Sequence, residues 1–302
     1  MRRKTEPPRG ILNTGAADPA RGSHERYHPP ADLAPFVEHF WSVTWDFRGT
    51  EPRRVETLPH PSVHMVFDRA AGATVSGVAK GKFVRMLEGE GGVFAAKFRP
   101  GGFSAFTDLP MTHLTGVTLK VGELFGPDGD AVARAVSHAS DDASRLAIVE
   151  AFLRARKPAR DEQADRIGDM VYDVARDRTI VKVDDLVARY ATNKRTLQRL
   201  FARYVGVSPK WVIQRYRLHE AAGQLAAGTA PSQSMLALEL GYSDQAHFVR
   251  DFSAVVGTTP ALYAKEARMD VALVATHETA LPPAGPAAAA RDGDVAGRRR
   301  TR

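Results

Sequence analysis

Apolar and polar residues alternate along residues 27–126, and this spacing predicts strands. Val43, Trp45 and Phe47 are each separated by one polar residue. A period of two places the apolar side chains on one face of a strand, where a sheet can bury them. Glycine and proline residues separate the short apolar runs. The pattern therefore predicts a small antiparallel sheet or barrel, with a short entry helix over residues 32–39.

From residue 127 to residue 179 the apolar spacing becomes that of helices. Leu146, Val149, Phe152 and Leu153 form one apolar stripe in this region. Residues three and four positions apart share one face of a helix, which needs a partner surface. These helices are expected to connect two domains. Their apolar face could pack on the sheet of the same chain or form a contact between two copies of the chain.

The segment from residue 180 to residue 269 contains an internal repeat with an offset of 51 positions. Six pairs of identical or similar residues show it: Leu197 and Phe248, Arg199 and Arg250, Phe201 and Phe252, Val205 and Val256, Gly206 and Gly257, Pro209 and Pro260. A repeat of this kind indicates that one structural unit occurs twice.

Each copy has the pattern of a helix-turn-helix unit. In the first copy we predict helices over residues 184–190 and 194–204, the second of which begins after the capping residue Asn193. Leu197 and Phe201 lie four positions apart and should face the core. This leaves a polar face exposed on the second helix, formed by Arg195, Gln198 and Arg199.

In the second copy we predict helices over residues 234–240 and 244–255. Phe248 and Phe252 should face the core, because they occupy the positions of Leu197 and Phe201. The exposed face then offers an amide, a guanidinium and two apolar side chains, which can hydrogen-bond base edges and contact thymine methyl groups. These residues are Gln245, Ala246, Val249 and Arg250.

The segment between the two units predicts one continuous helix over residues 209–227, stiff enough to fix their relative placement. From residue 182 to residue 217 there are nine basic and two acidic residues. The positive field that attracts polyanions is therefore centred on the first unit.

Three stretches carry a family resemblance. They are Arg195-Thr-Leu-Gln-Arg-Leu-Phe201, Gly206-Val-Ser-Pro209 and Leu240-Gly-Tyr-Ser-Asp-Gln-Ala-His-Phe-Val-Arg-Asp-Phe252. Over residues 180–265 the chain closely resembles the AraC/XylS family of transcription regulators. The resemblance implies that the DNA-binding residues are Lys194, Arg195, Gln198, Arg199, Gln245, Ala246, Val249 and Arg250. Ala191 departs from the family pattern, where glycine is more common, so the first turn is expected to be tighter or reshaped.

Two N-terminal stretches are similar to the sensory part of some members of this family. They are Phe98-Arg-Pro-Gly-Gly-Phe103 and the segment of residues 58–67. The resemblance implies a cupin-like β domain that binds a small-molecule effector. The expected fold class is α+β, with a small antiparallel β barrel, linker helices and an all-α domain with two helix-turn-helix units joined by a long helix.

The expected organisation has five parts. They are a disordered arm (residues 1–26), a β-rich sensory domain (27–126), a helical linker or dimer region (127–179), a double helix-turn-helix DNA-binding domain (180–269) and a disordered tail (270–302). The two tails are rich in arginine, proline, glycine or alanine and show no apolar periodicity, which is typical of disorder.

Composition narrows the function classes. The chain has 302 residues, enough for two domains, and its net charge of +7 favours a polyanionic partner. It has no cysteine, which excludes disulfides, thiolate metal sites and the alkyl transfer to cysteine found in some relatives of the family. A signal peptide and a run of ~18 apolar residues are both missing from the sequence, so we expect a soluble, cytoplasmic protein with no membrane partner.

The histidines of the β region are the candidate metal ligands. Their spacing with nearby carboxylates does not make a ligand set, and we therefore expect no metal, no cofactor and no catalytic residue. These histidines are His39, His60, His64 and His113. A metal-dependent enzyme in the β domain and a regulator that binds only proteins remain as rival functions. The main prediction is a transcription regulator, not an enzyme, that binds double-stranded DNA. Its further expected partners are RNA polymerase and an unidentified effector, and both activation and repression stay open.

Overall fold

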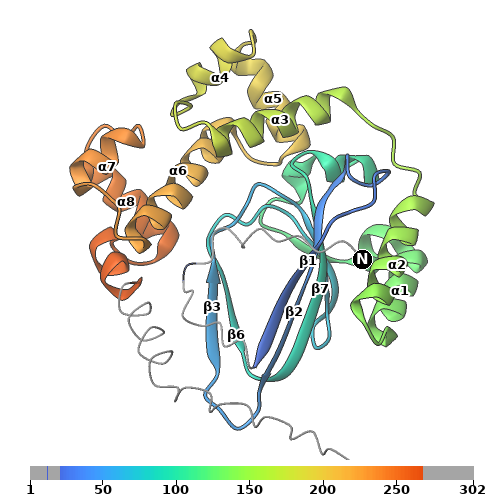
Figure 1. Cartoon of the computed structure of the whole chain (residues 1–302). Helices are drawn as coiled ribbons and strands as arrows, with labels where there is room; N and C mark the ends of the chain where they lie inside the picture. The colour runs from blue at the N-terminus through green and yellow to red at the C-terminus, as the bar shows by residue number, and fades with distance from the viewer. Residues whose placement is uncertain (1–11, 13–20, 268–302) are drawn as a thin grey trace, which may run out of the picture.

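The structure is a computed structural model that describes residue 12 and residues 21–267. The predicted tail (residues 270–302) and most of the predicted arm (residues 1–26) lie outside these described residues. Figure 1 shows a sheet region in the lower part of the molecule, with helices beside it and above it. The predicted α+β fold class is confirmed.

Six strands of the N-terminal region form one antiparallel sheet in the order β1-β2-β7-β4-β5-β8. The long strands β2 and β7 pair over most of their length, with Phe40 opposite Ala96. The strands β3 and β6 form a separate two-stranded ribbon. The bounds are β1 (Gly22–Tyr27), β2 (Val37–Phe47), β3 (Arg53–Thr57), β4 (His64–Asp68), β5 (Gly72–Ser76), β6 (Phe83–Leu87), β7 (Gly89–Phe98) and β8 (Thr118–Lys120).

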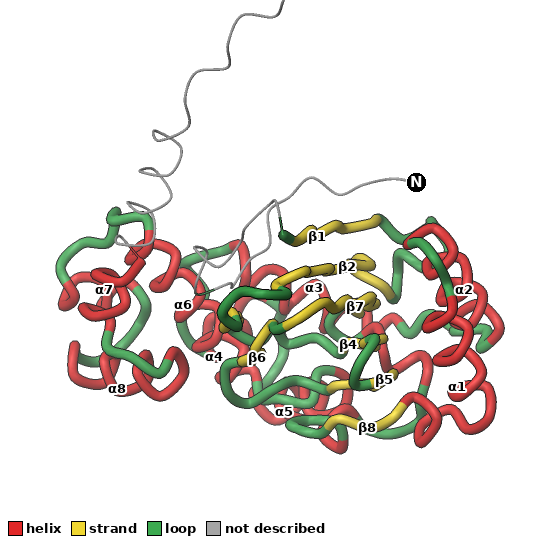
Figure 2. The backbone as a smooth tube through the Cα atoms, turned by 90° about the horizontal axis from the view of Figure 1, so that it is seen from below, coloured by secondary structure: helices red, strands yellow, loops and turns green. Residues whose placement is uncertain are grey.

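The sheet is open and does not close into the predicted barrel. The strands β1 and β8 stand at opposite ends of the sheet order, and β3 and β6 pair with each other. Figure 2 shows the strands side by side in this order. Closure would need hydrogen bonds between the two edges of a sheet. The edge strand β8 has only three residues before the chain turns into a helix, so it offers too little backbone for that pairing.

Two further expectations for the N-terminal region are wrong. Within the predicted disordered arm, residues 22–26 belong to β1, which pairs with β2 along its whole length. The hydroxyls of Ser23 and Thr44 also lie 2.8 Å apart across this pair. The predicted entry helix is absent, because residues 31–36 form turns and β2 starts at Val37. Edge pairing with β2 therefore orders a polar segment that has no apolar periodicity.

The main core lies between one face of the sheet and two helices, α1 (Val121–His138) and α2 (Asp142–Ala155). Phe40 and Phe98 of the sheet pack in one cluster with Val149 and Leu153 of α2. The apolar stripe predicted in this region is thus covered by the sheet of the same chain. Helix α1 has a left-handed residue at Gly126 (φ 62°), where two helical segments meet.

Between residue 156 and residue 267, where the described part ends, six labelled helices follow, and residues 260–267 are also helical. The helix α6 contributes to two separate apolar clusters: Ile213 packs with the first helix-turn-helix unit and Leu225 with the second. The prediction of one helix that contacts both units is confirmed. The bounds are α3 (Glu162–Arg176), α4 (Val183–Arg189), α5 (Lys194–Tyr204), α6 (Pro209–Ala226), α7 (Gln233–Glu239) and α8 (Gln245–Val256).

Two kinds of feature are absent from the described residues. No helix among them combines the length and the apolar character that crossing a bilayer requires. The same residues contain no group of three or more histidine, aspartate or glutamate side chains placed to hold a metal ion.

Candidate nucleic-acid interface

The first helix-turn-helix unit consists of α4, a short turn and α5. Asn193 caps α5, and its side-chain oxygen accepts a hydrogen bond from the backbone N–H of Thr196 at 2.9 Å. Ala191 in the turn has a φ of 46°. This is the left-handed region that favours glycine, so the turn keeps the required backbone shape although its residue departs from the family pattern. The predicted helix 194–204 is confirmed.

One face of α5 is buried and the opposite face is exposed. Leu197 and Phe201 are fully buried against α3, α4 and α6. Their burial fixes the rotation of α5, because residues on the other side of the helix must then point to solvent. Four of the predicted DNA-binding residues lie on this exposed side: Lys194, Arg195, Gln198 and Arg199.

The basic groups on α5 are accessible to an anion. Lys194 Nζ lies 2.7 Å from a carboxylate oxygen of Asp184, and both side chains are exposed. An exposed ion pair of this kind contributes little, so a phosphate can replace the carboxylate. Among the residues that the structure describes, neither Arg195 nor Arg199 forms an ion pair. Both guanidinium groups therefore keep their donors for another partner.

The second unit repeats this construction with α7 and α8. Asp244 caps α8 by accepting a hydrogen bond from the backbone N–H of His247 at 2.7 Å, which lowers the pKa of the carboxyl group. Gly241 takes the left-handed turn position with a φ of 81°. Phe248 and Phe252 are fully buried. The repeat inferred from the offset of 51 positions thus corresponds to two units of the same local structure.

The exposed face of α8 differs from that of α5. Gln245, Ala246 and Arg250 are exposed, whereas Val249 is half-buried against the core of the unit. The amide of Gln245 is engaged by α7: Ser234 Oγ donates to its oxygen at 2.7 Å, and its nitrogen donates to Gln233 at 3.1 Å. A base that binds Gln245 must replace these two exposed hydrogen bonds.

Two arginines of α6 do not belong to this interface, although they contribute to the basic surplus of the sequence. Arg217 is buried and donates to the backbone oxygens of Val174 and Asp177 at the end of α3. Arg215 is also buried, stacks on Trp211, and burial lowers its pKa to about 10. Both side chains stay charged at neutral pH, yet they serve packing.

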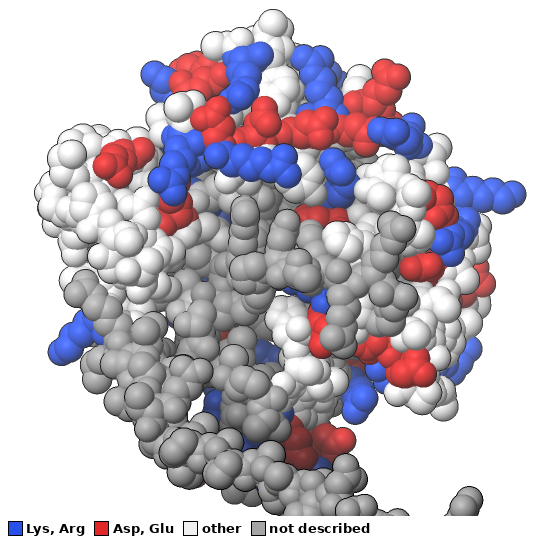
Figure 3. Space-filling view, in the orientation of Figure 1, with Lys and Arg blue, Asp and Glu red and all other residues white. Residues whose placement is uncertain are grey.

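Charge is distributed unevenly over the visible face of the molecule. In Figure 3, lysine and arginine side chains mix with acidic ones over α3, α4 and α5 at the top. Few basic side chains are visible over α7 and α8 at the left. The expectation of a less charged second unit agrees with this view.

Comparisons with known proteins support the helix-turn-helix assignment. Residues 186–266 match the family model of a helix-turn-helix domain, and residues 25–120 match a domain of unknown function (DUF6597). An uncharacterized HTH-type transcriptional regulator of Bacillus subtilis (strain 168), YfiF, is 35% identical over 83 residues. That match covers 28% of this chain and 26% of the Bacillus protein, so the chain spans about a quarter of the length of this relative.

The solved structures that resemble the chain include ToxT of Vibrio cholerae O395. It has a TM-score of 0.36 and 12% sequence identity, and the match covers 82% of this chain and 97% of that one. A second ToxT structure, bound to (E)-4-(8-methylnaphthalen-1-yl)but-3-enoic acid, has a TM-score of 0.33 at 12% identity, with coverages of 82% and 99%. At such low TM-scores the assignment depends on the family model and the Bacillus relative.

These matches identify one domain of the chain. Residues 186–266 form a helix-turn-helix domain of the AraC type, a DNA-binding domain found in transcription regulators. The resemblance inferred from the sequence is confirmed for this domain.

Sequence reasoning missed the residues that join the N-terminal region to this domain. Thr115 and Lys82 donate hydrogen bonds to the ends of the two second helices, and the backbone oxygen of Lys80 accepts one from α6. These residues lie in loops between strands and show no periodicity. Only the tertiary structure brings them to the helices.

Proposed function

We propose that the chain is a sequence-specific transcription regulator that binds double-stranded DNA with α5 and α8 in two successive major grooves. The observation that carries this proposal is the pair of exposed polar helix faces joined by a single helix, α6. A helix that is buried on one side and polar on the other fits the major groove, where base edges present distinct donors and acceptors.

The residues divide into three roles in this proposal. Arg195, Gln198 and Arg199 of the first unit read base edges, because guanidinium and amide groups form paired hydrogen bonds with guanine and adenine. Lys194 neutralises a phosphate in exchange for Asp184. In the second unit Gln245 and Arg250 read base edges, and the apolar contact with a thymine methyl group comes from Ala246 with the half-buried Val249.

The N-terminal region serves regulation in this proposal. Residues 27–126 form a sensory domain, residues 127–179 link it to the DNA-binding domain of residues 180–269, and an effector changes the contacts between them. The supporting observation is a charged cluster between sheet and linker. Lys97 of β7 lies 3.0 Å from Glu38, whose second oxygen accepts a hydrogen bond from Tyr172 of α3 at 3.2 Å. A ligand that binds Lys97 would disturb the link to α3.

RNA polymerase is the partner through which DNA binding would change transcription, and no enzymatic activity is part of the proposal. An effector is tested by thermal unfolding of the full chain in the presence of metabolites. A ligand of the sensory domain raises the unfolding temperature of the wild-type chain and does so less for Lys97→Met. A metabolite set without any such shift speaks against effector control.

The DNA-binding proposal is tested by selecting bound fragments from random double-stranded DNA. The wild-type chain is expected to recover a motif with two half-sites, and a variant with Arg195→Ala and Arg199→Ala is expected to lose one of them. Arg134→Ala is the matched control, because Arg134 is an exposed arginine of α1. The proposal would be contradicted if the fragments bound by the wild-type chain shared no sequence motif at a salt concentration where the chain still binds DNA.

A further inference from the structure

One short loop of the N-terminal region contacts both helix-turn-helix units and the helix that connects them. Residues 77–82 connect β5 with β6. Val78 in this loop is buried in the cluster that forms the core of the first unit. The backbone oxygen of Lys80 accepts a hydrogen bond at 3.0 Å from Arg215 of the connecting helix α6. Lys82 reaches the second unit.

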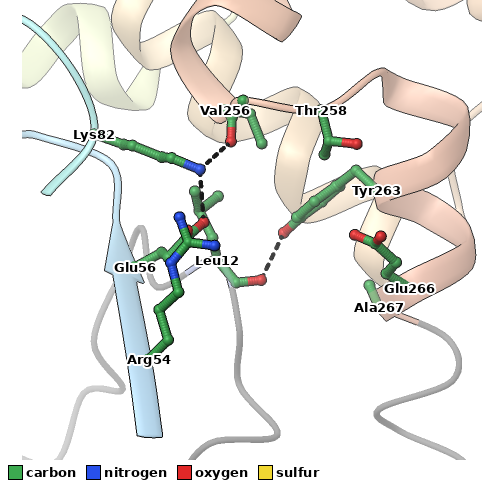
Figure 4. Close-up of a pocket in the computed structure, with 10 residues that line it drawn as sticks. Leu12, Arg54, Glu56, Lys82, Val256, Thr258, Tyr263, Glu266 and Ala267 are labelled. Atoms are coloured by element: carbon green, nitrogen blue, oxygen red, sulfur yellow. Dashed lines mark hydrogen bonds and ion pairs between the residues drawn. The ribbon is translucent and has the colours of Figure 1, made fainter. Parts of the chain in front are cut away.

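The contact of Lys82 with the second unit is made at the carboxyl end of α8. Lys82 Nζ donates to the backbone oxygen of Val256 at 2.8 Å and lies 2.9 Å from Glu56 of β3 (Figure 4). A cation at the carboxyl end of a helix is favoured, because the last carbonyl groups lack partners and carry partial negative charge. The ammonium group thus binds α8 to the β3–β6 ribbon.

The first unit is held one position further along, just beyond the end of its second helix. Thr115 Oγ1 donates to the backbone oxygen of Gly206 at 2.7 Å, at the carboxyl end of α5. Gly206 and Gly257 correspond in the internal repeat, and both lie against the N-terminal region. A Cβ atom at Gly206 would lie 2.5 Å from Thr115 Oγ1, and one at Gly257 would lie 2.6 Å from Lys82 Nζ. Both recognition helices are therefore held at their carboxyl ends, while their exposed reading faces stay uncovered.

These contacts matter because the two units have separate cores. The apolar residues of the first unit and those of the second unit form different clusters, and α6 belongs to both. A single helix can bend and twist between two bodies that it joins. Contacts from a third body to both units remove that freedom.

We propose that Lys82 and Thr115 are positioning residues that set the half-site spacing this protein accepts. By holding α5 and α8 to one rigid sheet domain, they fix the distance and rotation between the two reading faces. The loop of residues 77–82 carries this constraint from the sheet to α6. The inference rests on the proposed function, since spacing has meaning only for a protein that reads two half-sites.

The test uses the full-length chain and DNA that carries the selected motif. Equilibrium affinities are measured for the original site, for sites with two or five base pairs inserted between the half-sites, and for each half-site alone. The variants are Lys82→Met, which keeps the chain length and removes the charge, and Thr115→Val, which removes the hydroxyl. Lys120→Met is the control, because Lys120 is an exposed lysine of β8.

The wild-type chain and Lys120→Met are expected to bind the original site much more tightly than the sites with inserts. The spacing ratio is the affinity for the original site divided by the affinity for a site with an insert. For Lys82→Met and Thr115→Val we expect the spacing ratio to fall by about fivefold or more, the size of a typical coupling between sites. Affinity for each single half-site should stay within about twofold of wild type. Unfolding of one unit would lower the affinity for the half-site of that unit, so this readout separates positioning from unfolding.

Two outcomes overturn the inference in different ways. If both variants fold and keep the spacing ratio of the wild-type chain, neither residue sets the spacing. If each variant lost affinity for the half-site of the unit that it contacts, in parallel with its affinity for the complete site, the two residues would have a structural role instead. A wild-type chain without any sequence-selective binding would contradict the proposed function itself.

Discussion

The two helix-turn-helix units share one local structure but differ in how they are anchored and charged. The first unit packs against α3, and the buried Arg217 ties the adjoining helix α6 to the end of α3. The second unit contacts α6 and the β3–β6 ribbon, and its exposed face carries fewer charges. In the proposed function the first unit therefore supplies most of the electrostatic affinity for DNA. The second unit would add discrimination that depends on how firmly it is held.

Removal of a buried phenylalanine is expected to give the largest effect in either unit. Phe201→Ala and Phe252→Ala each create a cavity in a core where the side chain is fully buried, at a cost of ~3–5 kcal/mol. Phe252→Ala should unfold only the second unit and leave salt-dependent binding by the first. Denaturant unfolding and gel shifts measure both effects, with the exposed Phe83→Ala as the control. If either variant unfolded at the same denaturant concentration as the wild-type chain, its phenylalanine would not be a core residue, and the rotation assigned to its helix would be wrong.

The anchor of the first unit is tested by two arginines that contact the same glutamate. Arg217 is buried and donates to Glu220 at 2.7 Å, whereas the exposed Arg178 lies 2.6 Å from the other oxygen of Glu220. Arg217→Met removes the charged donor to two backbone oxygens and to one carboxylate oxygen of Glu220, so we expect a loss of about 3 kcal/mol. Arg178→Met should cost less than ~1 kcal/mol. Thermal unfolding measures both losses of stability. If Arg217→Met and Arg178→Met lost the same stability, Arg217 would not have the anchoring role assigned to it.

The reading faces are compared through Arg199→Ala and Arg250→Ala, which occupy equivalent positions. Each should weaken specific binding by ~1–3 kcal/mol and relax base preference in one half-site. The salt dependence of the affinity for DNA should fall more for Arg199→Ala than for Arg250→Ala, because the first unit carries more of the positive charge. Titrations at several salt concentrations measure this, with Arg134→Ala as the control. If specific and nonspecific affinity fell equally with an unchanged motif, Arg199 would be a phosphate contact.

The smallest expected effects come from the two turns, which use different residues in a left-handed conformation. Ala191→Gly should stabilise the first unit by about 0.5 kcal/mol, since glycine removes the strain of a positive φ but gains freedom in the unfolded chain. Gly241→Ala should destabilise the second unit by ~1–2 kcal/mol, because the new Cβ would also lie 2.8 Å from Val181 Cβ. Thermal unfolding measures whether each substitution raises or lowers stability. If Gly241→Ala raised the stability of the chain, this account would be contradicted.

The sequence was sufficient where periodicity and capping act locally. The spacing of Leu197 and Phe201, the cap at Asn193 and the repeat offset predicted the helices and the rotation of α5. It was insufficient where distant segments meet. The edge strand β1 is polar and is ordered by its pairing with β2, and the sheet stays open because β8 is short. The burial of Arg217 is also decided by tertiary packing, so a count of basic residues overstated the charge available to DNA.

The rigid coupling of the two units is the central claim and can be measured directly. Gel-shift titrations of the full-length chain compare the selected site with sites carrying about five or ten additional base pairs between the half-sites. Half a helical turn moves one half-site to the far side of the duplex, so the account predicts a loss of the base contacts of one unit. The remaining binding should depend steeply on salt. Equal affinity for the original site and the site with a half-turn insert would contradict the account.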